Sequence, residues 1–376
     1  MSDLPVVFNE IELSDGRKLG MAQLNAPKAL NALSLTMIEQ LLPQLTQWAT
    51  DETIAAVWLE GHGDKAFCAG GDIVELYRSM TEINGQGDPA QSNPYAERFF
   101  ATEYRLDYLI HTFPKPFIVW GNGIVMGGGM GLFAGANCRV VTEHSRLAMP
   151  EITIGLYPDV GGSWFLNRMP GRCGLFLGLT GAQMNAADAL FVGLADRFIA
   201  HEHRAAVIEA LQGLTWGGSD AACVQQVMRQ FEQQSHAQKP DSTVQAHYET
   251  IQQLTDADSA LGRVQKITAY AGEDPWLKRA AETLSRGSTT SMLLIQAQLQ
   301  RCLHNSLVQV FQQELNLSIQ CALKGEFSEG IRALLIDKDR RPRWHYAAAE
   351  QVEDGWIDGF FAPLWPQNPL SDLAPM

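Results

Sequence analysis

The feature that most constrains the fold is a glycine-rich run that starts directly after a short apolar stretch. Phe117 to Trp120 is predicted to be a buried strand, and residues 121–131, GNGIVMGGGMG, follow it. Three successive glycines stand where a helix should begin, and each glycine in a helix costs roughly 0.5 to 1 kcal/mol relative to alanine. The run therefore indicates close approach of the backbone to a ligand, with tight helix packing as the alternative. It is not a phosphate loop, because GxxxxGK[ST] needs a lysine and a hydroxyl that are absent.

A second glycine turn occurs earlier, in residues 66–73, AFCAGGDI. It follows the apolar segment Ile54 to Leu59, a predicted buried strand, and precedes an apparent helix. Paired glycines at such a turn let backbone N–H groups approach a ligand oxygen, and the start of a helix adds positive potential there. A plain tight turn explains the same pattern, so this segment alone leaves both interpretations open.

Two acidic residues stand in the apolar, proline- and glycine-bent segment 149–162, MPEITIGLYPDVGG. A carboxylate among Ile, Leu and Val either finds donors or has its pKa raised, which suits a proton shuttle or a nucleophile. Glu151 and Asp159 are therefore candidate catalytic residues. The alternatives are a surface position for Glu151 and a helix N-cap for Asp159, which precedes a Gly-Gly turn.

Strand and helix patterns alternate through the first 200 residues. Val6 to Leu13 and Lys18 to Leu24 alternate apolar and polar residues around Asp15-Gly16, which predicts a strand-turn-strand unit. Ser34 is expected to cap a helix over 33–48. Further strands are predicted at 54–59, 117–120, 139–142 and near 147, and a further helix is predicted at 95–111. Repeated strand, strand, helix units predict an α/β domain over residues 1–200, with helices covering its sheets.

Residues 201–376 differ in character, because strand signals are few and helical spacing of apolar residues dominates. This part is predicted to be a mainly helical C-terminal region. Its predicted helices lie at 204–234, 243–256, 277–285 and 290–323.

Composition excludes several classes of function. The net charge of −14 disfavours nucleic acid and anionic membranes, which bind clustered Lys and Arg. The six cysteines form no CxxC pair or ligand spacing, so a disulfide framework or zinc site is not expected. No apolar run approaches the ~20 residues of a membrane helix, and the N-terminus lacks the pattern of a signal or transit peptide. A cytoplasmic protein is therefore expected.

Taken together, the segments resemble the crotonase superfamily in order and spacing. The similarity runs from residues 27–33, PKALNAL, through both glycine turns to PEITIGLYPDVGG, about residues 5–200. It implies a spiral of repeated ββα units that binds an acyl-CoA thioester. By this resemblance the backbone N–H groups of Gly71 and Gly128 stabilise the thioester oxygen. The residues that it places along the CoA are Lys28, Ala29, Leu30, Ala69 and Ile73.

Side chains around the oxygen site point to one branch of the superfamily. Enoyl-CoA hydratases carry a Glu two residues after the triple glycine, where this chain has Gly131, while Glu151 matches their other Glu. Asp159 stands where hydratases have a small residue, and PE…GL(F/Y)PDVGG resembles 3-hydroxyisobutyryl-CoA hydrolases. Residues 99–104, FFATEY, resemble the FF…EY segment of these hydrolases, which implies that Glu103 binds substrate. A solvated helix acid is the alternative for Glu103. Residues 327–339 and 342–344 resemble the C-terminal region of the same hydrolases.

The resemblance implies hydrolysis of a short 3-hydroxyacyl-CoA, foremost 3-hydroxyisobutyryl-CoA of valine catabolism. Glu151 would attack the carbonyl or activate water, and Asp159 would bind the 3-hydroxyl or handle protons. No metal or redox cofactor is expected, CoA being part of the substrate. The resemblance leaves the oligomeric state open, because the superfamily usually forms homo-oligomers, whereas hydrolases with long helical C-termini can cover the site within one chain. The alternatives are an enoyl-CoA hydratase or isomerase and a non-catalytic, ribosome-associated scaffold.

Overall fold

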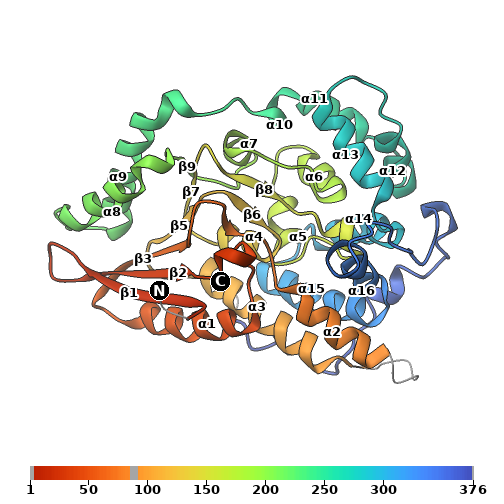
Figure 1. Cartoon of the computed structure of the whole chain (residues 1–376), viewed down its shortest axis with the longest axis horizontal. Coiled ribbons are helices and arrows are strands. Elements are labelled where there is room, and N and C mark those ends of the chain that lie inside the picture. The colour runs from red at the N-terminus through yellow and green to blue at the C-terminus, as the bar shows by residue number, and fades with distance from the viewer. Residues whose placement is uncertain (1–3, 85–91, 375–376) are drawn as a thin grey trace. The chain divides into compact units, whose positions relative to one another are not determined.

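The computed structural model describes residues 4–84 and 92–374 of the chain (Figure 1). By contacts among residues, the chain divides into two compact units, and each unit is assembled from three separate stretches. Unit 1 comprises residues 1–71, 106–147 and 184–246, and unit 2 comprises residues 72–105, 148–183 and 247–376. Both units include residues from either side of residue 200, and the domains 1–200 and 201–376 stay a prediction.

Unit 1 is built on a six-stranded sheet (Figure 1). In order across the sheet, its strands are β1 (Val6–Glu12), β2 (Lys18–Leu24), β3 (Ile54–Gly61), β5 (Phe117–Gly121), β7 (Cys138–Val141) and β9 (Arg197–Phe198). Strands β1 and β2 form the predicted antiparallel hairpin, and the later strands pair in parallel. All of β3 before Gly61 is buried, as expected for a parallel strand that is covered on both faces.

A second, three-stranded sheet carries the strands that lead into both glycine turns. In order, its strands are β4 (Ala66–Cys68), β6 (Ile124–Met126) and β8 (Arg146–Ala148). Strands β4 and β6 pair in parallel, with Ala66 opposite Ile124 and Cys68 opposite Val125. Because parallel strands run in the same direction, the turns that follow β4 and β6 leave the sheet at the same edge.

Two helices of unit 1 begin at side-chain caps that the sequence marks. The α-helices that lie wholly in this unit are α1 (Leu35–Thr50), α4 (Gly128–Ala134), α7 (Ala186–Phe191), α8 (Arg204–Gly213), α9 (Asp220–Ser235) and α10 (Thr243–Ala246). The predicted cap of α1 is confirmed, because Ser34 Oγ accepts a hydrogen bond from the Met37 N–H at 3.2 Å. In α7, Asn185 and Asp188 form a capping box.

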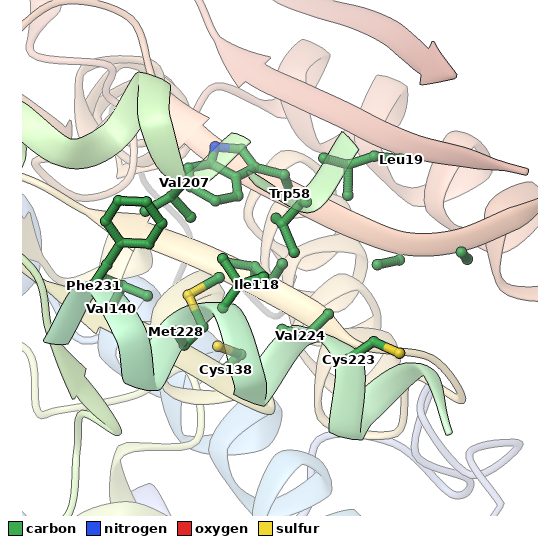
Figure 2. Packing of buried hydrophobic residues seen from close by; sticks show 14 of the residues in the cluster. Leu19, Trp58, Ile118, Cys138, Val140, Val207, Cys223, Val224, Met228 and Phe231 are labelled. Atoms are coloured by element: carbon green, nitrogen blue, oxygen red, sulfur yellow. The ribbon is translucent and has the colours of Figure 1, made fainter. Parts of the chain in front are cut away.

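The large sheet of unit 1 packs against α8 and α9 through a hydrophobic core (Figure 2). Val224, Met228 and Phe231 recur at helical spacing on α9 and point toward the sheet, so one face of the helix is apolar. On the sheet, the rings of Trp58 and Trp120 stack with their centroids 5.3 Å apart. Burial of each such large side chain contributes roughly 1.5 to 3 kcal/mol. This core fixes β3 and β5, and β5 leads into the glycine-rich run.

Unit 2 is almost entirely helical. Its elements are α2 (Ile73–Asn84), the first part of α3 (Pro94–His111), the 3-10 helix η2 (Glu151–Ile154), α5 (Gly162–Leu166), α6 (Cys173–Thr180), α11 (Tyr248–Leu254), α12 (Ala260–Thr268), α13 (Pro275–Arg286), α14 (Thr289–Cys302), α15 (Leu307–Leu323) and α16 (Glu326–Ile331). The rings of Phe100, Tyr104, Phe311 and Phe327 pack between α3, α15 and α16. Helices from the end of the chain thus build one core with α3.

The helical character predicted after residue 200 is confirmed, since β9 is the last strand of the described residues. The helical segments predicted at 204–234, 243–256 and 290–323 are each divided into two helices. The last of these segments is broken between Cys302 and Leu307, because Ser306 and Gln309 form a capping box that starts α15. In the described part of the chain, no helix combines the length and apolarity that crossing a membrane requires.

Candidate functional site

Unit 1 brings the two predicted glycine turns together. The backbone of Gly70 has φ +123°, a conformation that L-residues rarely adopt. A Cβ atom on Gly70 would lie 3.5 Å from the carbonyl oxygen of Met126 and 3.9 Å from the Cα of Gly127. The Gly70-Gly71 turn after β4 therefore lies against the Gly127-Gly128 turn after β6.

The triple glycine combines a packing requirement with an available backbone donor. A Cβ atom on Gly129 would lie 2.3 Å from the carbonyl oxygen of Cys68, so α4 packs on β4 at a distance that only glycine allows. Gly128 is the first residue of α4, where the backbone N–H has no acceptor inside the helix. Packing thus explains Gly129, and Gly128 keeps the donor that the resemblance requires.

The residues predicted along the CoA divide between the units. In unit 1, Lys28 and Ala29 are exposed on a single 3-10 turn, and Leu30 follows in the left-handed conformation with φ 53°. The Ala69 N–H donates to the Leu30 carbonyl at 3.1 Å, which holds Leu30 beside the Gly70-Gly71 turn. Ile73 is the first residue of α2 and belongs to unit 2.

Sequence reasoning missed Asn31, which anchors this turn in unit 1. Asn31 is 1% exposed, and its Nδ2 donates to the carbonyls of Ala66 at 2.9 Å and His62 at 3.1 Å. Its Oδ1 accepts from the Ala26 N–H at 3.0 Å. Asn31 is in the left-handed conformation, with φ 55°, which Asn adopts more readily than most residues. The Asn in the PKALNAL stretch is therefore the signal that could have identified this turn.

In unit 2, Glu151 is buried at the start of η2. Its side chain is 4% exposed, and Oε2 has no hydrogen-bond partner among the described residues. Burial raises the pKa of Glu151 well above its usual value, and the charge of Asp159 raises it further. The turn is fixed by close packing, since a Cβ on Gly155 would lie 2.5 Å from the carbonyl oxygen of Glu326. A surface position for Glu151 is therefore wrong.

Glu103, on α3, is a second buried acid of unit 2. It is 2% exposed, and its Oε1 also lacks a partner within the described residues. Burial raises the pKa of Glu103 well above its usual value, with the charge of Asp159 as the second cause. The alternative of a solvated helix acid is therefore wrong. Because a carboxyl group buried without partners is costly, Glu103 is suited to meet a polar group of a ligand.

Asp159 is the third buried acid and is 4% exposed. Burial raises its pKa from 3.8 to about 6, although a hydrogen bond from the Tyr104 hydroxyl to Oδ2, at 2.7 Å, opposes the rise. The alternative that Asp159 caps a helix is wrong, because Gly161 stands at the N-cap of α5. The residue after it, Val160, has φ 51°, which is strained for a β-branched residue.

Sequence reasoning also missed Glu314, which holds this strained turn from α15. Glu314 is fully buried, and its two carboxyl oxygens accept from the N–H groups of Gly161 at 2.7 Å and Ser163 at 2.9 Å. Burial raises its pKa to about 8, while the two backbone bonds oppose the rise. A single Glu on the apolar face of LVQVFQQELNLSIQCAL is the signal that could have identified it.

Three hydroxyl groups continue from Asp159 toward α15. The Tyr104 hydroxyl lies 2.7 Å from Ser318 Oγ, and Ser318 Oγ lies 2.9 Å from the Tyr157 hydroxyl. The Tyr157 hydroxyl donates to the backbone carbonyl of Glu314 at 2.8 Å. We name Tyr104, Ser318 and Tyr157 the hydroxyl chain. Its members come from segments far apart in the sequence, and no motif marks them.

We name Glu103, Glu151, Asp159 and Glu314 the carboxyl cluster. Within the described residues none of the four forms an ion pair, and no group of three His, Cys, Asp or Glu side chains could hold a metal ion. Buried carboxyl groups that repel one another retain protons at a pH where exposed ones are ionised. The cluster can therefore exchange protons near neutral pH, or use an ionised member as a nucleophile.

Curated proteins and a family model match most of the chain. The model of the enoyl-CoA hydratase/isomerase family matches residues 19–361. The 3-hydroxyisobutyryl-CoA hydrolase of Danio rerio is 39% identical over 351 residues, covering 92% of this chain and 88% of that protein. The hydrolase of the same name from Gallus gallus is 37% identical, with 92% and 86% covered. Both names include the word mitochondrial.

Two solved structures match over nearly the whole chain. The enoyl-CoA hydratase from Rhodobacter sphaeroides 2.4.1 has a TM-score of 0.81 at 32% identity, covering 96% of this chain and 98% of that chain. The carnitinyl-CoA dehydratase from Mycobacterium thermoresistibile has a TM-score of 0.83 at 31% identity, with the same coverage. These similarities confirm the predicted α/β fold class with its helical C-terminal region.

Proposed function

The chain belongs to the enoyl-CoA hydratase/isomerase family, and on that premise we propose that it hydrolyses a short 3-hydroxyacyl-CoA, with 3-hydroxyisobutyryl-CoA as first candidate. The resemblance to the crotonase superfamily and its 3-hydroxyisobutyryl-CoA hydrolases is confirmed by these relatives. The observation that carries the proposal is the buried pair Glu151 and Asp159, in which Glu151 Oε2 is unpartnered among the described residues. When ionised, such a carboxylate is an effective nucleophile or base, because water does not solvate it.

In the proposed reaction, the N–H groups of Gly71 and Gly128 donate to the thioester oxygen. Negative charge develops on that oxygen as the carbonyl carbon is attacked, and each such donor typically contributes about 2.7 to 4 kcal/mol in the transition state. The adjacent positions of the two glycine turns in unit 1 support this role. Lys28, Ala29, Leu30, Ala69 and Ile73 are proposed to lie along the CoA.

Glu151 has two possible routes to the same products. In one, its carboxylate attacks the thioester carbon, which gives a mixed anhydride and releases CoA thiol before water completes hydrolysis. In the other, Glu151 accepts a proton from water, which attacks the carbonyl carbon directly. Borohydride added during turnover, followed by mass spectrometry of the peptide that contains Glu151, separates them. Conversion of the Glu151 carboxyl group to an alcohol supports the anhydride, and an unchanged Glu151 supports direct attack by water.

Asp159 and Glu103 are proposed to select and process the 3-hydroxyacyl group. Asp159 would accept a hydrogen bond from the 3-hydroxyl or exchange protons with the leaving sulfur, and the unpartnered Oε1 of Glu103 would contact the substrate. An added methyl group changes discrimination in an apolar pocket by only ~1 to 3 kcal/mol, so 3-hydroxypropionyl-CoA is also a candidate substrate. No metal or redox cofactor has a part in these steps, and activity should survive dialysis against a chelator.

Three further expectations belong to this proposal. A place in valine degradation depends on the identity of the acyl group. The relatives are named as mitochondrial, so the expected cytoplasmic location needs cell fractionation as its test. The oligomeric state is open between a homo-oligomer and a single chain whose C-terminal region covers the site, and sedimentation of the purified protein measures it.

Hydration of an enoyl-CoA is the second candidate, because the two similar structures are titled a hydratase and a dehydratase. Gly131 weighs against it, since this position lacks the second glutamate of hydratases. The deciding experiment mixes the protein with 3-hydroxyisobutyryl-CoA, 3-hydroxypropionyl-CoA and crotonyl-CoA and follows free thiol and enoyl absorbance together. Thiol release from the hydroxyacyl substrates supports hydrolysis, and enoyl loss without thiol supports hydration. If neither thiol release nor enoyl loss is observed, a non-catalytic scaffold is favoured.

A further inference from the structure

The hydroxyl chain contains four contacts but only three hydroxyl hydrogens. The contacts join Asp159 to Tyr104 at 2.7 Å, Tyr104 to Ser318 at 2.7 Å, Ser318 to Tyr157 at 2.9 Å, and Tyr157 to the Glu314 carbonyl at 2.8 Å. Every one of these groups is buried. A contact that lacks a hydrogen therefore places two oxygen lone pairs against each other, away from water.

Tyr104 donates to Asp159 when the carboxyl group is ionised. If all four contacts are to carry a hydrogen, counting from the Glu314 end gives the direction of every bond. A backbone carbonyl only accepts, so the Tyr157 hydrogen points to Glu314. The Ser318 hydrogen must then point to Tyr157, and the Tyr104 hydrogen to Ser318. The contact between Tyr104 and Asp159 is left to be made by a hydrogen on Asp159. The four contacts are complete when Asp159 is protonated, and one is lost when it is ionised.

We propose that Tyr104, Ser318 and Tyr157 are positioning residues that hold a proton on Asp159 for transfer to the leaving sulfur. The proposal rests on the hydrolase function. The proton stays on Asp159 until the thioester is cleaved. Tyr104 then turns its hydrogen to the new Asp159 carboxylate, and Ser318 turns its hydrogen to Tyr104, so the charge gains a donor when it appears.

The resulting sequence balances protons and electron pairs. In the reactive form Glu151 is ionised and Asp159 is protonated. The Glu151 carboxylate attacks the carbonyl carbon, the C–S bond breaks, and sulfur takes the bonding pair and the Asp159 proton. Water then adds to the acyl carbon of the anhydride, and the bond to the Glu151 oxygen breaks. Asp159 takes the proton that water loses, Glu151 is again a carboxylate, and the hydroxyl chain returns to its first direction. The transfer to sulfur is the same if Glu151 activates water instead.

The surroundings of Asp159 favour the protonated form. The groups that interact with its charge are acids or neutral hydroxyl and thiol groups, and none of the described residues pairs with it as a cation. These groups are Glu103 and Tyr104 on α3, Glu151 on η2, Tyr157 in the same segment, and Glu314 and Cys321 on α15. Burial raises the pKa of Asp159 to about 6.

The first test needs no substrate, so it is independent of the proposed function. Infrared spectra of the whole protein are compared with those of Asp159→Asn, whose amide donates to Tyr104 as a protonated acid would. A carbonyl band of a protonated carboxyl group that shifts in D₂O and is missing in the variant is the expected result. The band should titrate away as the pH rises through about 6. Its absence from the wild-type spectrum at pH 5 would overturn the proposal.

The second test uses variants that should shift this titration in opposite directions. Tyr104→Phe removes the donor that stabilises ionised Asp159 more strongly than the protonated form, so the midpoint should rise. Ser318→Ala and Tyr157→Phe remove the competing hydrogen-bond partners further along the hydroxyl chain. Tyr104 is then free to donate to the carboxylate, and the midpoint should fall. Each shift should be roughly half to one pH unit, the equivalent of about one hydrogen bond.

Ser318→Thr keeps the hydroxyl and is the matched control, with an unchanged midpoint. If the protein hydrolyses the thioester, the pH dependence of kcat/KM should contain the same midpoint, and that midpoint should shift with the infrared one in each variant. A purely structural role for these residues predicts lower activity at every pH with a fixed midpoint. Shifts of equal sign in Tyr104→Phe and Ser318→Ala would overturn the proposal. If the thiol assay shows no activity but the infrared shifts appear as expected, the hydrolase function is rejected and the role of Asp159 in holding a proton stands.

Discussion

The glycine turns of unit 1 and the carboxyl cluster of unit 2 differ in what holds them in place. In unit 1 the proposed donors are backbone N–H groups, positioned by the paired strands β4 and β6 and by the close approach of Gly129 to Cys68. Apart from the side chain of Cys68, these contacts are made by backbone atoms. In unit 2 the reactive groups are side chains, and every one of the four is a buried acid.

The two regions therefore affect stability in opposite ways. Backbone donors at the end of a paired strand cost little, since tight packing of α4 on β4 is itself favourable. Buried acids without cations cost free energy whenever they ionise, and the strained turn at Val160 adds to that cost. Contacts from α15 offset part of it, through Glu314 and Ser318. Reactivity in unit 2 is thus obtained at the expense of stability.

The largest expected effect separates the chemistry of unit 2 from binding by unit 1. Glu151→Gln keeps the shape of the side chain but removes the nucleophile or base. Thiol release should fall by about a thousandfold or more, which corresponds to about 4 kcal/mol in the transition state. Affinity for CoA, measured by calorimetry, should change little.

Glu353→Gln, on the exposed end of the chain, is the matched control and should keep full turnover. Turnover that survives in Glu151→Gln would remove Glu151 from the mechanism. Loss of CoA binding together with turnover would show instead that the two regions do not act separately.

The second effect is that of Asp159→Asn, which should raise the free energy of unfolding while it lowers activity. The raised pKa of Asp159 favours the folded protein when the carboxyl group is protonated, so this contribution is fully present below pH 3.8. It is lost as the pH rises through about 6. The difference of about two pKa units corresponds to about 3 kcal/mol. Asp159→Asn does not ionise, and it should therefore be more stable than the wild type at pH 7, by up to about 3 kcal/mol, while losing activity.

Urea unfolding of both proteins between pH 4 and 8 measures this difference. The gain in free energy of unfolding should be small near pH 4 and should grow up to about pH 7. Asp258→Asn replaces an exposed acid of the same unit and is the control. If Asp159→Asn is less stable than the wild type at pH 7, ionised Asp159 does not destabilise unit 2.

The same contrast explains how far the sequence predicts each region. Glycines that must lie close to a backbone atom are visible as glycines, so both turns of unit 1 are found from residues 66–73 and 121–131 alone. The burial of Glu151 is also predictable, because its neighbours in the chain are apolar. The support of Asp159 is not, because Ser318 stands 214 residues after Tyr104 in the sequence. Local sequence patterns do not reveal such contacts, because the contacts depend on the final packing of α15.

The third effect tests whether packing or ligand binding requires the triple glycine. In Gly129→Ala, the new Cβ would meet the Cys68 carbonyl oxygen at 2.3 Å, so α4 must move away from β4. The free energy of unfolding should fall by about 1 to 3 kcal/mol. Gly213→Ala is the control in the same unit, because its Cβ would meet nothing within 4 Å. Unfolding in urea measures both, and equal stability of the two variants would reject the packing explanation.

The smallest effect concerns the exposed edge of unit 1. Lys28 is exposed and is proposed to lie along the CoA, where a solvated charge contributes less than about 1 kcal/mol. Lys28→Ala should therefore raise KM by about fivefold or less and leave kcat and the free energy of unfolding unchanged. The effect should shrink as salt is added, because an exposed charge pair is screened. Lys239→Ala, another exposed lysine of unit 1, should change neither constant. A fall in kcat for Lys28→Ala would mean that this region also contributes to the transition state, and the separation of binding from chemistry between the two units would no longer hold.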